Sequence, residues 1–274
     1  MASQSTTLPH RPTTKFVGDA QSLQYFISEL EDLTISHPAK ILFLDLEGIN
    51  LSRHGSISLL TLLIHDISTQ APHPDQLYLI DIHTLGSSTF TTPSNQQSST
   101  LKHILESPVI CKVLFDVRND SDALFAHFGI HLQGTIDLQL MENLSRPGRN
   151  KRLVHGLGRC IKSDSSLSFN DKLIWEATKE AGLTLFAPEK GGRYEVFNDR
   201  PLRQEISEYC TQDVWCMPGI YHVYQARLES SGVWDWEVRV GRETENRLVN
   251  SRSQGYQPHG RDKALAPKWD AVLV

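Results

Sequence analysis

The sequence predicts an α/β fold in which a mixed β-sheet is flanked by helices and followed by a helical C-terminal extension. Apolar, strand-like runs dominate the first half of the chain, and helical patterns alone follow from about residue 152. This order favours a mixed sheet covered by helices over a regular alternation of strands and helices. The 274 residues, 39% of them hydrophobic and 22% charged, suffice for one well-filled domain with extensions or for two small domains.

The first part of the chain is predicted to form a tail, a helix and three strands. Residues 1–16 are expected to be a disordered tail, and apolar residues at helical spacing predict a helix over 20–33. Strands are expected at 41–46, 57–64 and 77–82. The Pro/His/Asp-rich turn at 71–76 indicates that the last two of these strands run antiparallel.

The later elements are mostly helical. Residues 87–99 are poor in apolar side chains and predict a loop, and the helix over 120–128 is expected to end at Gly129, a usual C-cap. The other expected elements are a helix at 100–106, a strand at 109–115, a short strand at 135–140 running into a helix, and helices at 152–162, 170–182, 202–228 and 235–250.

Charged side chains interrupt this apolar pattern at the end of the first strand. Asp45 and Glu47 follow Ile-Leu-Phe-Leu, and their spacing of two places both side chains on one face of a strand. Two acids on one face are costly unless they are paired or bind a metal ion. The alternative is that the strand has reached solvent there.

A second acidic patch follows the strand at 109–115. If a helix begins near Asn119, then Asp120 lies on its apolar face, and Asp122 is rotated by about 200° onto the solvated face. Asp120 is therefore the candidate, in preference to Asp116 and Asp122. The alternative is an ordinary acid at a helix N-terminus.

A third patch pairs a tyrosine with an acid. Tyr209 and Asp213 are four residues apart in an expected helix, so they project together. A tyrosine there suits orienting or deprotonating a water, beside an acid that binds a metal ion. The alternative is a surface pair on a helix.

Taken in order, the three patches resemble the motifs of the ribonuclease D-like branch of the DEDD 3′–5′ exonucleases, in the subtype with tyrosine in the third motif. The matching segments are Asp45-Leu-Glu47, Asp120 nine residues before Gly129, and Arg200-Pro-Leu followed by Tyr209-x-x-x-Asp213. The family often has Thr where this chain has Gly48, and often His where it has Phe115-Asp116. The stretch from Lys112 also resembles the exonuclease-domain subgroup related to Egalitarian, some of whose members are RNA-binding adaptors without metal-binding acids.

The resemblance implies a ribonuclease H-like exonuclease domain over 17–228 and a helical or irregular extension over 229–274. It implies hydrolysis from the 3′ end of nucleic acid, RNA favoured, with single-stranded RNA 3′ ends as the expected partner. It also implies two Mg²⁺ or Mn²⁺ ions held by Asp45, Glu47, Asp120 and Asp213, with Tyr209 positioning the attacking water. The alternative is a catalytically weak or inactive RNA-binding adaptor on the same fold.

The charge distribution is consistent with such an enzyme. A formal net charge of −5 argues against a general nucleic-acid coat protein but not against a nuclease, whose acids are offset by bound cations. The densest basic cluster contains Arg149, Lys151 and Arg152, which are candidates to contact substrate phosphates; a solvated loop is the alternative.

Cysteine spacing and hydropathy bear on the compartment. The four cysteines show no C-x-x-C spacing and suggest no disulfide framework, which predicts a reduced protein in the cytoplasm or nucleus, with Cys111 a small core residue. No apolar run approaches the roughly 20 residues of a membrane span, so no membrane association is expected. The Ser/Thr-rich N-terminus fits an organelle-transit segment less well than a disordered tail.

Overall fold

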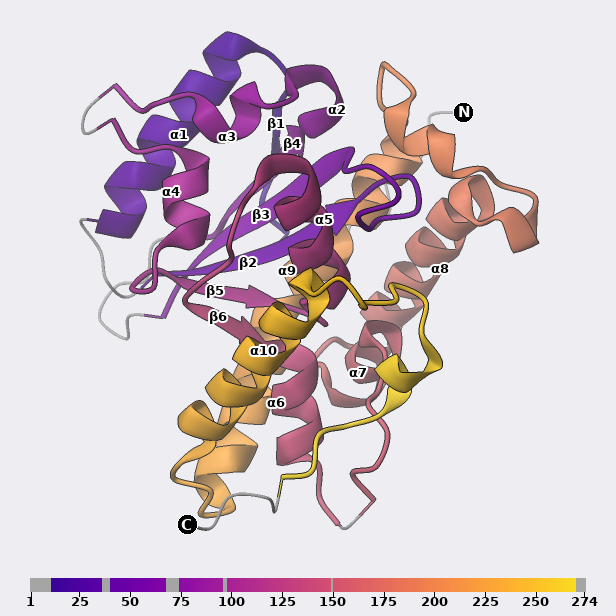
Figure 1. The fold of residues 1–274 in the computed structure, drawn as a ribbon. Helices are drawn as coiled ribbons and strands as arrows, with labels where there is room; N and C mark the ends of the chain where they lie inside the picture. The colour runs from indigo at the N-terminus through magenta and orange to yellow at the C-terminus, as the bar shows by residue number, and fades with distance from the viewer. Residues whose placement is uncertain (1–10, 36–39, 68–73, 96–97, 149, 270–274) are drawn as a thin grey trace.

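The structure, a computed structural model of the chain, describes residues 11–35, 40–67, 74–95, 98–148 and 150–269 (Figure 1). Within these ranges one mixed sheet has six strands in the order β1-β4-β3-β2-β5-β6. The strands are β1 (Thr14–Val17), β2 (Lys40–Glu47), β3 (Leu59–Asp66), β4 (Gln76–Asp81), β5 (Cys111–Leu114) and β6 (Thr135–Asp137). β3 pairs antiparallel with β2 and β4, whereas β1 with β4, β2 with β5, and β5 with β6 are parallel pairs. The predicted mixed sheet is confirmed.

Helices cover the sheet on both sides. They are α1 (Ala20–Ile35), α2 (Ile82–Leu85), α3 (Ser88–Thr91), α4 (Leu101–Glu106), α5 (Arg118–Phe128), α6 (Leu138–Ser145), α7 (Leu157–Asp164), α8 (Phe169–Phe186), α9 (Gln204–Ser230) and α10 (Trp236–Arg252). Short 3₁₀ helices occupy Pro188–Lys190, Tyr194–Asn198 and Arg261–Ala264. Figure 1 shows α1, α3 and α4 on one side of the sheet, α8 and α9 on the other, and α10 beside α6 and β6.

The central strand β2 separates the two halves of the core because successive side chains leave opposite faces. Leu42, Leu44 and Leu46 pack in the cluster that contains α1, α4 and α5. Phe43 packs on the other face, edge-on to Tyr221 of α9, with 5.8 Å between ring centroids. Since Asp45 and Glu47 continue the Phe43 face, β2 carries its acids toward α9.

Several elements differ from their sequence prediction. Thr14–Val17 forms β1 against β4, so the predicted tail does not reach residue 16; residues 1–10 lie outside the described ranges. The predicted loop at 87–99 contains the short helix α3, because Phe90 is buried and packs on Phe128 at 4.5 Å between ring centroids. Val109 is 88% exposed, and β5 begins only at Cys111, which is partly rather than fully buried.

The remaining predicted helices are present with shifted ends. Helix α7 begins at Leu157 rather than near residue 152, and α8 extends to Phe186. α5 ends at Gly129, as predicted, with this residue in the left-handed conformation. All four cysteines are free thiols, and no described helix is long and apolar enough to cross a membrane.

Candidate active site

The first acidic pair lies at the end of the central strand. Asp45 and Glu47 are partly exposed, and they pair across the sheet with Thr61 and Leu59 of β3. Gly48 follows at once because the chain turns back tightly here: a Cβ on this residue would lie 2.1 Å from the backbone oxygen of Ser56. The position where the resembling family often has threonine is therefore closed to any side chain.

Asp120 lies in the first turn of α5 and is 5% exposed. Asp122, predicted on the solvated face, is instead fully buried, so that prediction is wrong. The cause is Arg53 from the loop after β2: its backbone N–H and its Nε donate to the Asp122 carboxylate at 2.8 and 2.6 Å. Asp122 is thus paired with a guanidinium, whereas no described residue donates a hydrogen bond to Oδ1 of Asp120.

Helix α9 supplies the third patch. Tyr209 and Asp213 are 8% and 5% exposed and lie one helical turn apart, as predicted. The edge of Tyr209 meets Phe186 of α8 at 4.9 Å between ring centroids. Gly182 of α8 lies directly against Tyr209, where a Cβ would come within 2.6 Å of the tyrosine side chain. The close contact of α8 and α9 therefore fixes this ring.

Lys179 of α8 is a site residue that the sequence reasoning missed. Its Nζ donates to Oδ2 of Asp213 in a short ion pair and lies 5.1 Å from the ring centroid of Tyr209. The sequence signal is a lysine in an otherwise apolar helical stripe: Trp175, Lys179, Gly182 and Phe186 follow one another at spacings of four, three and four. A charged residue in such a stripe indicates a buried partner.

The acids of the three patches act on one another electrostatically. Removal from water and the charge of Asp213 raise the pKa of Asp45 from 3.8 to about 7, with Lys179 opposing the rise. Burial and then Asp45 raise the pKa of Glu47 well above its usual value, and the same two causes raise the pKa of Asp120. Asp45 is therefore the acid at which the three patches meet.

The phenol of Tyr209 is held in its neutral form. Burial raises its pKa, and the charges of Glu47, Asp213 and Asp45 raise it further. A neutral phenol donates a hydrogen bond but is a poor base. Tyr209 thus suits orienting a ligand better than removing its proton.

The donor set fits hard divalent cations. Oδ1 of Asp120 and Oδ1 of Asp213 are buried, and neither has a hydrogen-bond partner within the part of the chain that the structure describes. Carboxylate oxygens are the ligands that Mg²⁺ and Mn²⁺ prefer. Among the described residues, however, no three His, Cys, Asp or Glu side chains are close enough together to form a ligand cluster, and Lys179 is the positive charge nearest Asp213.

The predicted basic contacts lie apart from these acids. Arg149 is outside the described residues, and Lys151 donates to the carbonyl oxygen of Leu144. Lys151 and Arg152 line a hollow of about 1180 Å³ together with Arg239, Lys268 and Trp269. The cations that oppose the raised pKa values of the acids are Lys179 and Lys263 instead.

Carboxylates from β2, α5 and α9 thus interact electrostatically at the end of a central strand of a mixed sheet. Residues 15–229 match the family model of the 3′–5′ exonuclease, and the chain belongs to this family, as an RNase D-like DEDD member. The predicted ribonuclease H-like, exonuclease-type fold is confirmed. A comparison with curated proteins finds no match.

Solved structures show the same fold. RNase D from Trypanosoma brucei in complex with GMP is 20% identical, with a TM-score of 0.66 over 92% of this chain and 69% of that chain. Its complex with RNA U12 is 22% identical, with a TM-score of 0.62 over 95% and 75% of the two chains. RNase D from Escherichia coli is 20% identical, with a TM-score of 0.52 over 88% and 51%.

Proposed function

We propose that this protein is a metal-dependent 3′–5′ exonuclease that hydrolyses the phosphodiester bonds of nucleic acid, with single-stranded RNA favoured. The observation that carries the proposal is the meeting of acids from β2, α5 and α9: the charge of Asp213 raises the pKa of Asp45, and the charge of Asp45 raises the pKa values of Glu47 and Asp120. Membership of the exonuclease family supports the reaction class. The complex of T. brucei RNase D with RNA U12 supports an RNA substrate.

In this proposal Asp45, Glu47, Asp120 and Asp213 hold two Mg²⁺ or Mn²⁺ ions, for which the two unsatisfied carboxylate oxygens are suited. Divalent ions bound there would activate a water and stabilise the charge of the leaving 3′ oxygen. The chain itself gathers the acids, buries Asp120 and Asp213, and orients the attacking water through the neutral hydroxyl of Tyr209.

A second candidate function is an RNA-binding adaptor that does not cleave. The ion pair of Lys179 with Asp213 favours it, because a protein cation already neutralises one of the four acids. The preserved set of four carboxylates favours the nuclease. The two functions differ in whether a divalent cation enters the acidic cluster and product is released.

The decisive experiment digests labelled single strands in Mg²⁺, in Mn²⁺ and in chelator, using RNA and DNA of the same sequence. We expect metal-dependent release of nucleoside 5′-monophosphates from the 3′ end, faster on RNA, and no release by Asp45→Asn. Glu176→Gln changes a partly exposed acid of α8; it is the matched control and should digest like the parent protein.

Each result separates the candidates. RNA binding without release in either metal would reject the nuclease and support the adaptor. Release by Asp45→Asn at the parental rate would reject the proposed site while keeping the reaction.

We further assign Lys151 and Arg152 a role in holding nucleic acid at a distance from the acids, because they share one hollow with Arg239 and Lys268. A single strand releases about 0.7 counterions per phosphate contact. The variant Lys151→Gln/Arg152→Gln should therefore flatten the dependence of log affinity on log salt by about 1.4. Lys15→Gln on the edge strand β1 is the control, and an unchanged slope in the double variant would reject the contact.

A further inference from the structure

The first turn of α5, which carries Asp120, is held by a segment beyond the range that matches the exonuclease family. The family match ends at residue 229. Helix α10 lies against α5 and β6 (Figure 1), and we call this helix together with the residues after it, 236–265, the C-terminal clamp.

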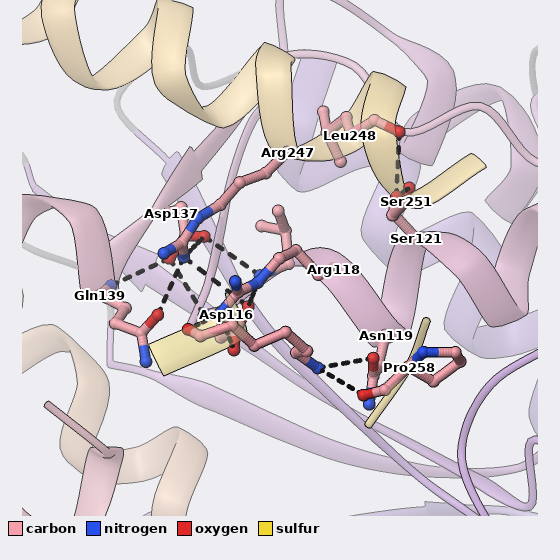
Figure 2. Close-up of polar contacts among 12 residues, drawn as sticks. Asp116, Arg118, Asn119, Ser121, Asp137, Gln139, Arg247, Leu248, Ser251 and Pro258 are labelled. Carbon is pink, nitrogen blue, oxygen red and sulfur yellow. Dashed lines mark hydrogen bonds and ion pairs between the residues drawn. The ribbon is translucent and has the colours of Figure 1, made fainter. Parts of the chain in front are cut away.

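Arg247 of the clamp acts through Asp137, at the end of β6. The Asp137 carboxylate accepts the backbone N–H groups of Asp116 and Val117 at 3.0 and 3.2 Å, and these residues lead into α5. The Nη1 of Arg247 donates to Oδ2 of Asp137 at 2.6 Å and to Oε1 of Gln139 at 2.9 Å (Figure 2). Asp137 is fully buried, so Arg247 supplies the positive charge that this carboxylate requires.

The clamp also bonds the two residues that precede Asp120. Oδ1 of Asn119 accepts the hydroxyl of Tyr256 at 2.6 Å and the ammonium of Lys263 at 2.7 Å. The Nη2 of Arg118 donates to the carbonyl oxygen of Lys263 at 2.9 Å. Arg118 and Asn119 are therefore both fixed from the clamp, two residues and one residue before the candidate metal ligand Asp120.

The backbone explains why this support is needed. Asp116 has a φ of 65°, a left-handed conformation that residues other than glycine rarely adopt. Its carboxylate accepts hydrogen bonds from Nε and Nη2 of Arg118 at 2.6 and 2.8 Å. The turn from β5 into α5 is thus strained, and it persists because the surrounding contacts determine it.

The loop after the first motif is tied to the same segment. Arg53, which holds Asp122, also donates from Nη2 to the carbonyl oxygen of Ser251 at 2.6 Å, and its guanidinium lies 5.8 Å from the ring centroid of Tyr256. Ser251 bonds Ser121 of α5 at 3.0 Å between hydroxyl oxygens. The clamp therefore joins the surroundings of the first two acidic patches.

We propose that the C-terminal clamp positions Asp120 for metal binding, with Arg247, Tyr256 and Lys263 as its positioning residues. This inference rests on the proposed function, because it assigns Asp120 to a divalent cation. Tyr256 and Lys263 act on Asn119, and Arg247 acts on the turn before α5; none of the three needs to touch the cation. Replacing a residue that orients a metal ligand without contacting the metal ion typically weakens metal affinity by about 10-fold or more.

The experiment uses the full chain and the variants Tyr256→Phe and Lys263→Met. Mn²⁺ binding to the protein without substrate is measured by electron paramagnetic resonance, thermal unfolding is measured in chelator, and 3′-end release is measured across Mg²⁺ concentrations. We expect Tyr256→Phe to weaken Mn²⁺ binding by about 10-fold and to move half-maximal activity to higher Mg²⁺, with the rate at saturating metal nearly restored. Lys263→Met should weaken Mn²⁺ binding by less, because it also removes a positive charge that lowers the pKa of Asp120.

Two further variants separate positioning from general stability. Lys263→Arg keeps a donor for Asn119 and should recover most of the affinity. Arg261→Ala removes an exposed cation from the same 3₁₀ helix and should bind Mn²⁺ like the parent. If Lys263→Met fails to fold, Tyr256→Phe, which loses a single hydroxyl, still carries the test.

The outcomes are distinguishable. Variants that unfold at lower temperature but bind Mn²⁺ as tightly as the parent would overturn the clamp proposal and leave the proposed function intact. A parent protein that binds no Mn²⁺ and releases no nucleotide would overturn the proposed function, and the positioning role with it.

Discussion

The four candidate metal ligands have two flanks, one formed by α9 with Asp213 and the other by α5 with Asp120, and these flanks support their carboxylates in different ways. On the α9 flank, Asp213 is in direct contact with a cation, Lys179, from the neighbouring helix. On the α5 flank, no ion pair of Asp120 is found among the described residues, and the support goes to the residues before it; Oδ1 of either acid has no hydrogen-bond partner there. The α9 flank therefore places a cation beside Asp213, whereas the α5 flank fixes the backbone that carries Asp120.

Two carboxylates with the same exposed fraction can therefore have different roles. Asp213 and Asp120 are each 5% exposed. A cation beside a carboxylate lowers the cost of its charge but competes with a metal ion for it. Fixing the backbone places no cation in direct contact with the carboxylate, which leaves the carboxylate ready for a ligand at a cost in stability.

Activity should depend on both flanks alike. Asp120→Asn and Asp213→Asn should each reduce 3′-end release about 10³-fold or more, because a divalent ion supplies several kcal/mol of transition-state stabilisation. Initial rates at saturating Mg²⁺ measure this. Near-parental turnover in either variant would remove that flank from the site.

The thermal stability of variants in chelator should differ between the α5 flank and the α9 flank. Because the folded-state pKa of Asp120 and of Asp45 is raised, the folded protein binds more protons than the unfolded chain, and stability falls as the pH rises from about 4 toward 7. Asp120→Asn and Asp45→Asn should therefore raise the unfolding midpoint in chelator at pH 7.5, by about 2–6 °C for about 1–2 kcal/mol.

Asp213→Asn should show no such gain, because it leaves Lys179 without its carboxylate. Calorimetry of the three variants at pH 5 and pH 7.5 compares them, and the gain should shrink at pH 5. A midpoint that rises equally in all three would contradict the distinction between the flanks.

Metal affinity should respond to the cation on the α9 flank. Lys179→Met should tighten Mn²⁺ binding on the order of tenfold, because it removes a positive charge from beside a candidate ligand. Lys162→Met is the matched control, since Lys162 of α7 forms its ion pair with Glu176 of α8 rather than with one of the four acids. Weaker Mn²⁺ binding by Lys179→Met would instead identify the lysine as a support for the ligand geometry.

The smallest expected effect is the coupling between the flanks. In a double-mutant cycle, Lys179→Met and Lys263→Met should change the Mn²⁺ binding free energy additively, within about 0.5 kcal/mol, because no contact is shared between them. Calorimetric titration of the two single variants and the double variant measures this coupling. A larger coupling would show that the two flanks act as one unit.

Periodicity predicted the parts of this site that depend on local sequence. Alternation in β2 predicted that Asp45 and Glu47 share a face, and helical spacing predicted that Tyr209 and Asp213 project together. These outcomes follow from the backbone geometry of one element. Strand β1 was missed because its four residues hold too little pattern to be separated from a tail.

The supporting residues could not be predicted in the same way. Arg53 is 69 residues from the acid it buries, and Lys179 is 34 residues from Asp213. Such pairings depend on how separate elements pack, which a single sequence without aligned relatives does not reveal. The residues from Tyr256 to Lys263 lack periodicity altogether, because they act through individual hydrogen bonds rather than an apolar face.

The bond between Arg247 and Asp137 bears on where this protein can be divided. A chain ended at residue 229, where similarity to the exonuclease family stops, would lose Arg247, the counter-charge of Asp137, together with the helix α10 that packs on β6 and α5. Removing one partner of such a pair costs about 3–5 kcal/mol, a large part of the stability of an ordinary domain. The segment that matches the exonuclease family and the segment that folds as one unit therefore have different boundaries. Only a chain that includes the C-terminal clamp is expected to fold by itself.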